Sequence, residues 1–317
     1  MKFIPHPVLI TRLLACSALL AMAPSPLTAA EAPTAPDNDS PFSFTLGSGW
    51  RRDELRWTIA GDSSGRNPNI LSELDWTDLE IIPVSLVGEL TFLKRWHLAL
   101  EGSYGTITGG KNRDSDYNSN NRRGQFSRSR AETEGKVLDG SLLLGYDFPL
   151  HSRLILTPWA GVTLRRQDLN DKNGVSEIDT ESGETGAFSG LDSKYGAEWR
   201  GGVLGLEGKL RLSDRWRLRA GFRYALLDYE GTGEWNLRDD MDGFKHTATG
   251  HGWQLQAGAE WDLAPRWTLG VSAFYGRYTT SSGTDETILN DGGRVSTRLN
   301  EVEWKTAGVN AAVTFKF

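Results

Sequence analysis

The chain of 317 residues lacks most of the features by which soluble enzymes and helical membrane proteins are recognised. Its single cysteine, Cys16, lies near the start, so a mature chain without its first thirty residues would have no disulfide. No apolar run of about twenty residues follows the N-terminal segment, which excludes a transmembrane helix. No Ser-His-Asp order, glycine-rich phosphate loop or cysteine nucleophile is recognisable, so no familiar catalytic motif is present.

The N-terminus has the pattern of a secretory signal peptide over residues 1–30. Lys2 and Arg12 supply the basic start, residues 13–23 form a short apolar core, and Ala29-Ala30 precedes Glu31. Residues 31–41 are polar and rich in proline, so we expect a disordered periplasmic lead-in segment. The remaining residues, 42–317, are predicted to form one domain.

Composition argues for a membrane protein that crosses the bilayer with strands. The formal net charge is −6, and it becomes −8 without Lys2 and Arg12, so a nucleic-acid partner is not expected. The mean hydropathy of −0.42 is that of a soluble protein. The 36 glycines, 12 tryptophans, 12 phenylalanines and 8 tyrosines are nevertheless typical of a transmembrane barrel, whose strands alternate lipid-facing and lumen-facing residues.

Ten strand candidates with period two follow residue 42, and the clearest begins at Trp216. One of its faces carries Trp216, Leu218, Ala220, Phe222, Tyr224 and Leu226, and the other carries Arg217, Arg219, Gly221 and Arg223. A soluble sandwich could alternate in the same way. The inward charged residues are expected to pair with one another, which leaves little room for a channel and makes a narrow pore the weakest functional alternative.

Three further features favour the membrane. Short turns near residues 93–95, 150–152, 212–215 and 263–266 alternate with long polar connections near 61–70, 110–134, 170–195, 237–250 and 284–298, as in outer-membrane barrels. Residues 311–317 alternate and end in Phe317, like the signal read by the barrel assembly machinery. Tryptophans gather near strand ends as an interfacial girdle would: Trp57, Trp76, Trp96, Trp199, Trp216, Trp235, Trp253, Trp267 and Trp304.

These patterns predict an all-β, antiparallel, up-and-down transmembrane β-barrel of about ten strands. It would lie in the outer membrane of a Gram-negative bacterium after Sec-type export, with long extracellular loops, short periplasmic turns and both termini on the periplasmic side. Several strands are longer than a bilayer requires, so the barrel should project outward. The expected partners are outer-membrane lipid, lipopolysaccharide and the barrel assembly machinery.

The segment 109–117 contains the best candidate for chemistry. Asp114 and Asp116 are two residues apart, so on a strand their side chains would share one face. Like charges that close disfavour double ionisation, which makes one carboxyl usable as an acid or base near neutral pH. The simpler interpretation is a loop tip with two solvated acids.

The later polar connections offer weaker candidates. Asp171, Glu177 and Asp179 hint at calcium ligands, although their spacing does not fit the standard twelve-residue loop. His246 and His251 could bind a metal but are more simply solvated, so no metal or cofactor is predicted. The fourth connection also carries Asp240 and Asp242, and a couple of His246 with one of them could activate a water held against Asp114 and Asp116.

The first third of the chain resembles the omptins, ten-stranded outer-membrane endoproteases. The resemblance rests on Phe44-Thr45-Leu46-Gly47, Arg52-Asp53-Glu54-Leu55-Arg56-Trp57, Ser72-Glu73-Leu74-Asp75-Trp76 and Gly109-Gly110 with Asp114-Ser115-Asp116-Tyr117. It implies that Asp114 and Asp116 match the omptin aspartate pair and that Glu54 helps to bind basic substrate side chains. Residues 67–74, 114–117 and 126–129 also resemble the Protochlamydia-type outer-membrane proteins, and more closely.

The sequence departs from the omptins in the fourth connection. Omptins have an Asp-x-His there, whereas residues 235–246 contain none, and Asp242 precedes His246 by four positions. A misplacement near 1 Å can cost about a hundredfold in rate. Enzyme activity is therefore left open. The first hypothesis is a barrel of omptin-like architecture whose function lies at its extracellular mouth. Without catalysis, that function would be adhesion, binding of a peptide or surface ligand, or envelope structure. The alternative is an omptin-like aspartic-type surface endoprotease.

Overall fold

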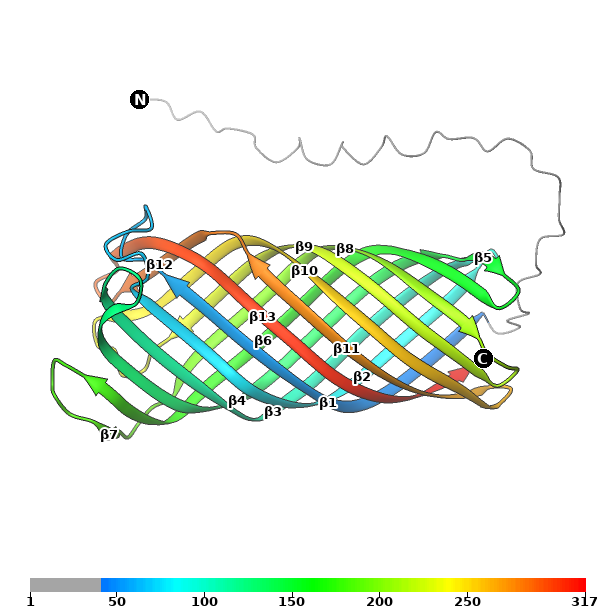
Figure 1. Cartoon of the computed structure of the whole chain (residues 1–317), viewed down its shortest axis with the longest axis horizontal. Coiled ribbons are helices and arrows are strands. Elements are labelled where there is room, and N and C mark those ends of the chain that lie inside the picture. The colour runs from blue at the N-terminus through cyan, green and yellow to red at the C-terminus, as the bar shows by residue number, and fades with distance from the viewer. Residues whose placement is uncertain (1–40) are drawn as a thin grey trace, which may run out of the picture. The chain divides into compact units, whose positions relative to one another are not determined.

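Residues 41–317 form a closed antiparallel β-barrel in the computed structural model (Figure 1). The predicted signal peptide, and all but Pro41 of the predicted lead-in segment, lie outside the described residues. Over 41–317, no helix is both long and apolar enough to cross a membrane.

Ten long strands follow one another around the ring, as predicted. They are β1 (Phe42–Ile59), β2 (Ser72–Phe92), β3 (Trp96–Ser119), β4 (Arg123–Tyr146), β6 (Leu154–Asp179), β8 (Ser193–Arg211), β9 (Trp216–Glu234), β10 (Met241–Ala264), β11 (Trp267–Thr280) continued by β12 (Gly283–Leu289), and β13 (Arg294–Lys316). The short strands β5 (Phe148–His151) and β7 (Gly186–Ala187) pair with β6. Pairing of β1 with β13, from Ser43 opposite Lys316 to Ile59 opposite Leu299, closes the ring.

The outer face carries an apolar belt at the end of the barrel where Phe42 and Phe317 lie against each other. Large apolar side chains are exposed there on every long strand, among them Leu46, Ile82, Leu100 and Val162. We define the belt as residues 42–50, 82–92, 96–104, 138–148, 154–162, 204–212, 216–226, 255–263, 267–275 and 309–317. Each segment has about nine to eleven residues, the length that a tilted strand needs to cross a bilayer.

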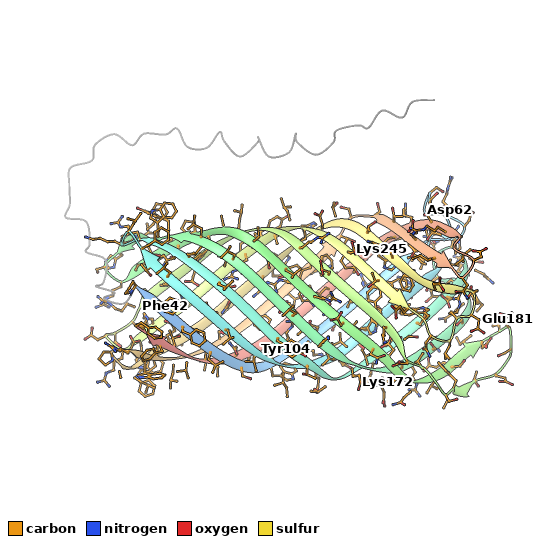
Figure 2. The ribbon with its side chains drawn as sticks, turned by 180° about the vertical axis from the view of Figure 1, so that it is seen from behind. Phe42, Asp62, Tyr104, Lys172, Glu181 and Lys245 are labelled. Carbon is orange, nitrogen blue, oxygen red and sulfur yellow. The ribbon has the colours of Figure 1, made fainter. Side chains whose placement is uncertain are left out.

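Beyond the belt the same strands continue as an extracellular projection. Its outer face carries ion pairs instead of apolar residues, such as Arg56–Glu301 at 3.2 Å and Lys245–Glu230 at 3.0 Å. Figure 2 shows Lys172, Glu181 and Lys245 at the end opposite Phe42. The predicted projection is confirmed, and the connections are shorter than predicted because most of residues 110–134 and 284–298 are strand.

The lumen of the projection is filled by an aromatic plug. Its members are contributed by seven different strands of the ring: Trp57, Trp76, Tyr195, Trp199, Tyr229, Phe244, Tyr278 and Trp304. The girdle prediction is therefore wrong for Trp57, Trp76, Trp199 and Trp304, which are at most 3% exposed inside the barrel. The girdle does include Trp96, Trp216 and Trp267, which lie exposed at the edge of the belt.

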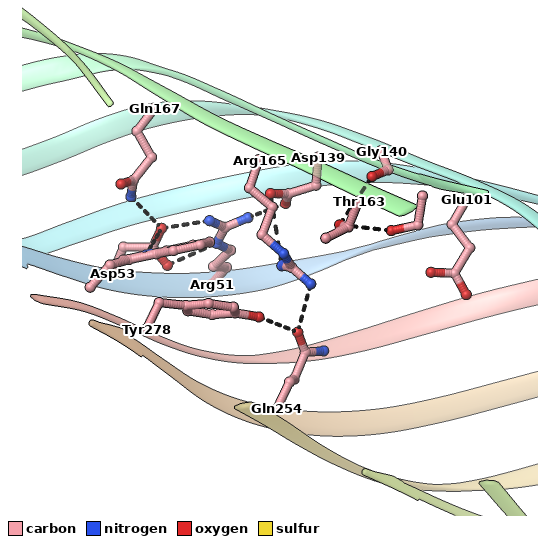
Figure 3. Close-up of polar contacts among 12 residues, drawn as sticks. Arg51, Asp53, Glu101, Asp139, Gly140, Thr163, Arg165, Gln167, Gln254 and Tyr278 are labelled. Carbon is pink, nitrogen blue, oxygen red and sulfur yellow. Dashed lines mark hydrogen bonds and ion pairs between the residues drawn. The ribbon is translucent and has the colours of Figure 1, made fainter. Parts of the chain in front are cut away.

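Beneath the plug, a polar crosspiece spans the lumen (Figure 3). Asp53 accepts hydrogen bonds from Arg51 at 2.6 Å, from Gln167 at 2.8 Å and from the indole of Trp304 at 3.0 Å. Arg51 also donates to Asp139 across the ring. These contacts join β1, β4, β6 and β13.

Further ion pairs fill the lumen toward the periplasmic end. Arg219 pairs with Glu207 at 3.0 Å and with Glu260 at 2.8 Å, and Arg223 pairs with Glu101 at 2.6 Å. The predicted pairing of inward charges is thus confirmed. A cavity beside Arg165 and Tyr278 measures only about 10 Å³, the size of one water position.

Asp53 and its neighbour Glu54 allow a matched test of this core. Asp53→Ala would leave Gln167 and Trp304 without this buried acceptor and Arg51 with Asp139 alone, so we expect a loss of about 3 kcal/mol or more in the free energy of unfolding. Glu54→Ala loses only an exposed pair with Lys305 at 3.3 Å and should cost less than about 1 kcal/mol. Urea unfolding in lipid vesicles measures both, and equal losses would contradict the assigned core.

Candidate functional site at the extracellular end of the lumen

The acid pair lies on β3, just beyond an irregularity in the strand. The register of β3 against β4 shifts between Ile107 and Lys111, around Gly109 and Gly110. Beyond the shift, Asp114 lies opposite Leu74 and Asp116 lies opposite Ser72 on β2. Both carboxyl groups face the lumen, so the predicted shared face is present, in a strand rather than in a loop.

Burial dominates the electrostatics of the pair. It raises the pKa of Asp114 well above its usual range, and the negative charges of Asp116 and Asp171 raise this pKa further. Burial also raises the pKa of Asp116, although hydrogen bonds from Ser72 and Ser127 oppose the shift. One oxygen of Asp114, Oδ1, is buried without a hydrogen-bond partner among the described residues. The pair therefore binds protons more tightly than solvated aspartates do.

A third acid, Asp171 of β6, lies beside the pair. The sequence did not reveal that its side chain faces the lumen. It is 4% exposed and accepts hydrogen bonds from Trp76 Nε1 at 3.1 Å and from Thr133 Oγ1 at 2.6 Å. Burial raises its pKa to about 6. We name Asp114, Asp116 and Asp171 the acid cluster.

The hint of calcium ligands in the same segment finds no support in the geometry. Asp171 faces the lumen, whereas Glu177 pairs with Arg128 at 2.8 Å and Asp179 binds the turn residue Ser182 at 2.5 Å. Their oxygens therefore do not converge on one ion. Within residues 41–317, no group of three or more His, Cys, Asp or Glu side chains is placed to hold a metal.

His246 is fully buried within the aromatic plug. Its Nδ1 lies 2.9 Å from the hydroxyl of Tyr195, and its Nε2 lies 3.2 Å from Oδ1 of Asp285 on β12. Thr297 donates to the other oxygen of Asp285 at 2.9 Å, and Tyr195 shares a 2.6 Å hydrogen bond with Tyr229. Nδ1 of the histidine is therefore hydrogen-bonded, whereas Nε2 faces the Asp285 carboxylate without forming a hydrogen bond among the described residues.

The predicted pairing of His246 with Asp240 or Asp242 is wrong. Asp285 lies directly opposite His246 in the pairing of β10 with β12, and the register shifts between Met241 and Gly243, which leaves Asp242 exposed. Asp240 instead binds Arg238 at 2.7 Å, which holds its pKa at about 2. The true partner comes from another strand, which sequence spacing could not show.

Aromatic rings lie around His246 and beside the acid cluster. Trp76, which donates to Asp171, stacks on Tyr195 with ring centroids 5.0 Å apart. The rings of Trp57 and Phe244 lie 4.9 Å and 5.0 Å from His246. His246 thus has Tyr195 and Asp285 as its polar neighbours and makes no described contact with Asp114 or Asp116.

Two other predicted site residues face away from the lumen. Glu54 lies on the outer face beside Lys305, and the lumen-facing acid of β1 is its neighbour Asp53. His251 is exposed and stacks on Tyr224, on the outer face of β9. Because His246 and His251 are five positions apart on one strand, they point to opposite sides and cannot share a metal.

The closed ring, the apolar belt and the lumen-facing acid cluster define a ten-stranded outer-membrane barrel of omptin-like architecture. The family model of the Protochlamydia outer membrane protein matches residues 45–317, so the chain belongs to that family. It is an outer-membrane protein, as predicted. A search of the curated proteins finds no match.

Solved structures support the fold. The outer membrane protease OmpT from Escherichia coli superposes with a TM-score of 0.74 at 16% identity, over 87% of this chain and 96% of that one. The translocator domain of autotransporter NalP from Neisseria meningitidis reaches only 0.38 at 11% identity, over 87% and 88%. At these identities the likeness to OmpT shows a shared fold and does not carry its activity over.

Asp171 makes the cluster testable by pH. Because its pKa is raised from 3.8 to about 6 in the folded state, stability falls as the pH rises between these values and stays lower above them. Asp171→Asn removes the buried charge, so it should stabilise the barrel at pH 8 by up to about 3 kcal/mol and change little at pH 4.

Urea unfolding at the two pH values measures the difference. The control is Asp168→Asn, which removes an exposed pair with Arg166 and should change stability by less than about 1 kcal/mol at either pH. Destabilisation of the Asp171 variant at pH 8 would contradict the assigned burial.

Proposed function

We propose that this barrel is a non-enzymatic cell-surface protein that binds a partner through its extracellular rim, with its lumen as a packed core. The observation that carries the proposal is the state of His246. A general base must reach the proton it abstracts within about 3 Å or through one water. His246 is 0% exposed, its Nδ1 is hydrogen-bonded to Tyr195, and its Nε2 faces Asp285 at 3.2 Å beneath the rings of Trp57 and Phe244, so the imidazole is closed off from solvent.

The rim itself supports a binding role because asparagines fix neighbouring loops to one another. Asn69 of the first loop accepts from the backbone of Asn121 in the second loop at 2.7 Å, and its own backbone donates to Asn120 at 2.7 Å. On β13, Asn300 donates to the carbonyl of Asn69 at 3.0 Å. A surface fixed in this way loses less conformational entropy on binding than free loops do.

The loops on the other side of the mouth are tied in the same manner. Asn236 of the fourth loop donates to the carbonyl of Gly190 at 2.6 Å and accepts from the backbone of Asp192 at 2.8 Å. Asn290 of the fifth loop contacts the carbonyl of Asp240. The connections between strands therefore form a pre-organised rim around the mouth, suited to recognising a peptide or surface ligand.

An omptin-like endoprotease is the second candidate, because the acid pair and a histidine–aspartate couple lie at the same end of the lumen. In that case Asp114 and Asp116 would hold the water, and His246 with Asp285, rather than with Asp240 or Asp242, would accept its proton. The aromatic rings around His246 would first have to move. A narrow pore gains no support from a lumen filled by the aromatic plug and the crosspiece.

A fluorogenic dibasic peptide separates the first two candidates. Refolded protein and its Asp116→Ala variant should both give no turnover above the protein-free blank, with and without lipopolysaccharide. OmpT assayed in parallel is the active control. Turnover by the wild type that Asp116→Ala or His246→Ala abolishes would replace the binding proposal with the protease.

We also propose the two envelope partners expected from the sequence. Lipopolysaccharide would meet the outward charges just above the belt, such as Lys136 and Arg200, and the barrel assembly machinery would bind β13. Lipopolysaccharide should raise the yield of the folded, heat-modifiable band in refolding.

Deletion of Phe317 should lower the folded, heat-modifiable band in cells but not in detergent refolding, and an equal loss in both would count against recognition of the strand by the machinery.

A further inference from the structure

The four periplasmic turns repeat one short pattern. In each turn a leucine is followed two or three positions later by an arginine, and in three of the four the next residue is tryptophan. The pairs are Leu93 with Arg95, Leu150 with Arg153, Leu212 with Arg215, and Leu263 with Arg266. Neither the barrel fold nor the extracellular site requires this repeat, because turns of this kind tolerate most polar residues.

The backbone holds each arginine at an equivalent position on the rim. The carbonyl of each one accepts a hydrogen bond from the adjoining strand, and the four donors lie at 2.8 or 2.9 Å. These bonds are Asp147 to Arg95, Arg211 to Arg153, Asp262 to Arg215, and Lys316 to Arg266. The arginines therefore recur around the end of the barrel, one for every hairpin.

The leucines of the repeat point away from the protein. Their exposed fractions are 80% for Leu93, 61% for Leu150, 50% for Leu212 and 46% for Leu263. Nearby, Trp96, Trp216 and Trp267 are exposed at the same edge of the belt. Exposed leucine beside interfacial tryptophan fits a surface that meets the apolar part of a lipid leaflet.

The arginines of the repeat have no acidic partner within residues 41–317. Arg153, Arg215 and Arg266 are exposed, Arg95 is half-buried, and none of the four forms an ion pair there. The carboxylates of the neighbouring rim residues are engaged inside the lumen. Asp147 pairs with His97 at 2.9 Å, and Asp262 pairs with Arg217.

Many outward arginines of the extracellular projection do have acidic partners, although Arg66 and Arg123 at its loops have none among the described residues. There Arg52, Arg113, Arg128 and Arg166 each pair with an acid of the same chain. At the periplasmic rim only Asp214, among the described turn residues, is an exposed acid. The rim thus presents fixed positive charge that the described protein does not neutralise.

We propose that this periplasmic rim, formed by the four turns, binds the headgroups of anionic phospholipids in the periplasmic leaflet, one phosphate to each arginine. A guanidinium can bind a phosphate through two parallel hydrogen bonds, and the adjacent leucine would contact the acyl chains of the same leaflet. A soluble acidic partner would match the arginines but would gain nothing from leucines placed beside tryptophans at the belt edge. The charge of the arginines and the position of the leucines at the belt edge therefore favour a lipid over a soluble acidic partner.

Native mass spectrometry of the detergent-solubilised barrel tests the proposal, with phosphatidylglycerol and phosphatidylcholine as probes. The rim variant carries Arg95→Gln, Arg153→Gln, Arg215→Gln and Arg266→Gln. The control variant carries the same change in charge on the projection, at Arg56→Gln, Arg113→Gln, Arg128→Gln and Arg166→Gln. Heat-modifiable migration verifies that each variant is folded, and the single rim variants replace the quadruple one if it does not fold.

The wild type and the control variant should bind phosphatidylglycerol several-fold more tightly than phosphatidylcholine. Each lost rim arginine should weaken phosphatidylglycerol binding by about fivefold at low ionic strength. Unchanged phosphatidylglycerol binding in the rim variant, or an equal loss in the control variant, would overturn the proposal. Binding of a polyglutamate peptide as tight as that of the lipid would overturn the choice of a lipid partner.

Discussion

The structure depends on the pairing of β1 with β13. A bilayer offers no water to unpaired backbone groups, so a sheet that crosses it must close on itself. Closure encloses every second side chain of ten strands in a narrow lumen. Those side chains must then satisfy one another, and the crosspiece around Asp53 and the ion pairs of Arg219 and Arg223 are the result.

Closure also explains why a likeness of fold does not carry chemistry with it. The chain places an acid cluster at the extracellular end, as the resemblance to the omptins implied, but the same end of the lumen is packed with indole and phenol rings. His246 has become a packing residue that joins β8, β10 and β12 through Tyr195 and Asp285. The proposal of a non-enzymatic barrel rests on these contacts of the histidine.

Much of this could be predicted from the sequence, because period-two patterning sets the face of each residue. The ten strands, the four short turns and the shared face of Asp114 and Asp116 follow from that patterning. Several errors arose where the same parity was not applied. Leu46 and Trp50 face the lipid, so Glu54, an even number of positions away, faces outward, while Asp53 and Trp57 face inward.

The remaining errors arose where the parity breaks. A register shift after Met241 turns Asp242 outward, and the pairing of β4 with β6 shifts twice between Arg128 and Glu132, before Asp171 is reached. Such irregularities are set by contacts between distant strands, so a single sequence gives little sign of them. The partnership of His246 with Asp285 depends on the pairing of β10 with β12 and could only come from the structure.

The height of the projection has a consequence for which parts of the sequence can vary. Its outward charges begin where the belt ends, so the extracellular loops are separated from the lipid by a length of closed barrel whose interior is packed with aromatic rings. Substitutions at the tips of the loops alter neither membrane solubility nor the packing beneath them. On the proposed binding function, the extracellular loops can change in sequence to recognise different partners while the part that crosses the membrane stays the same.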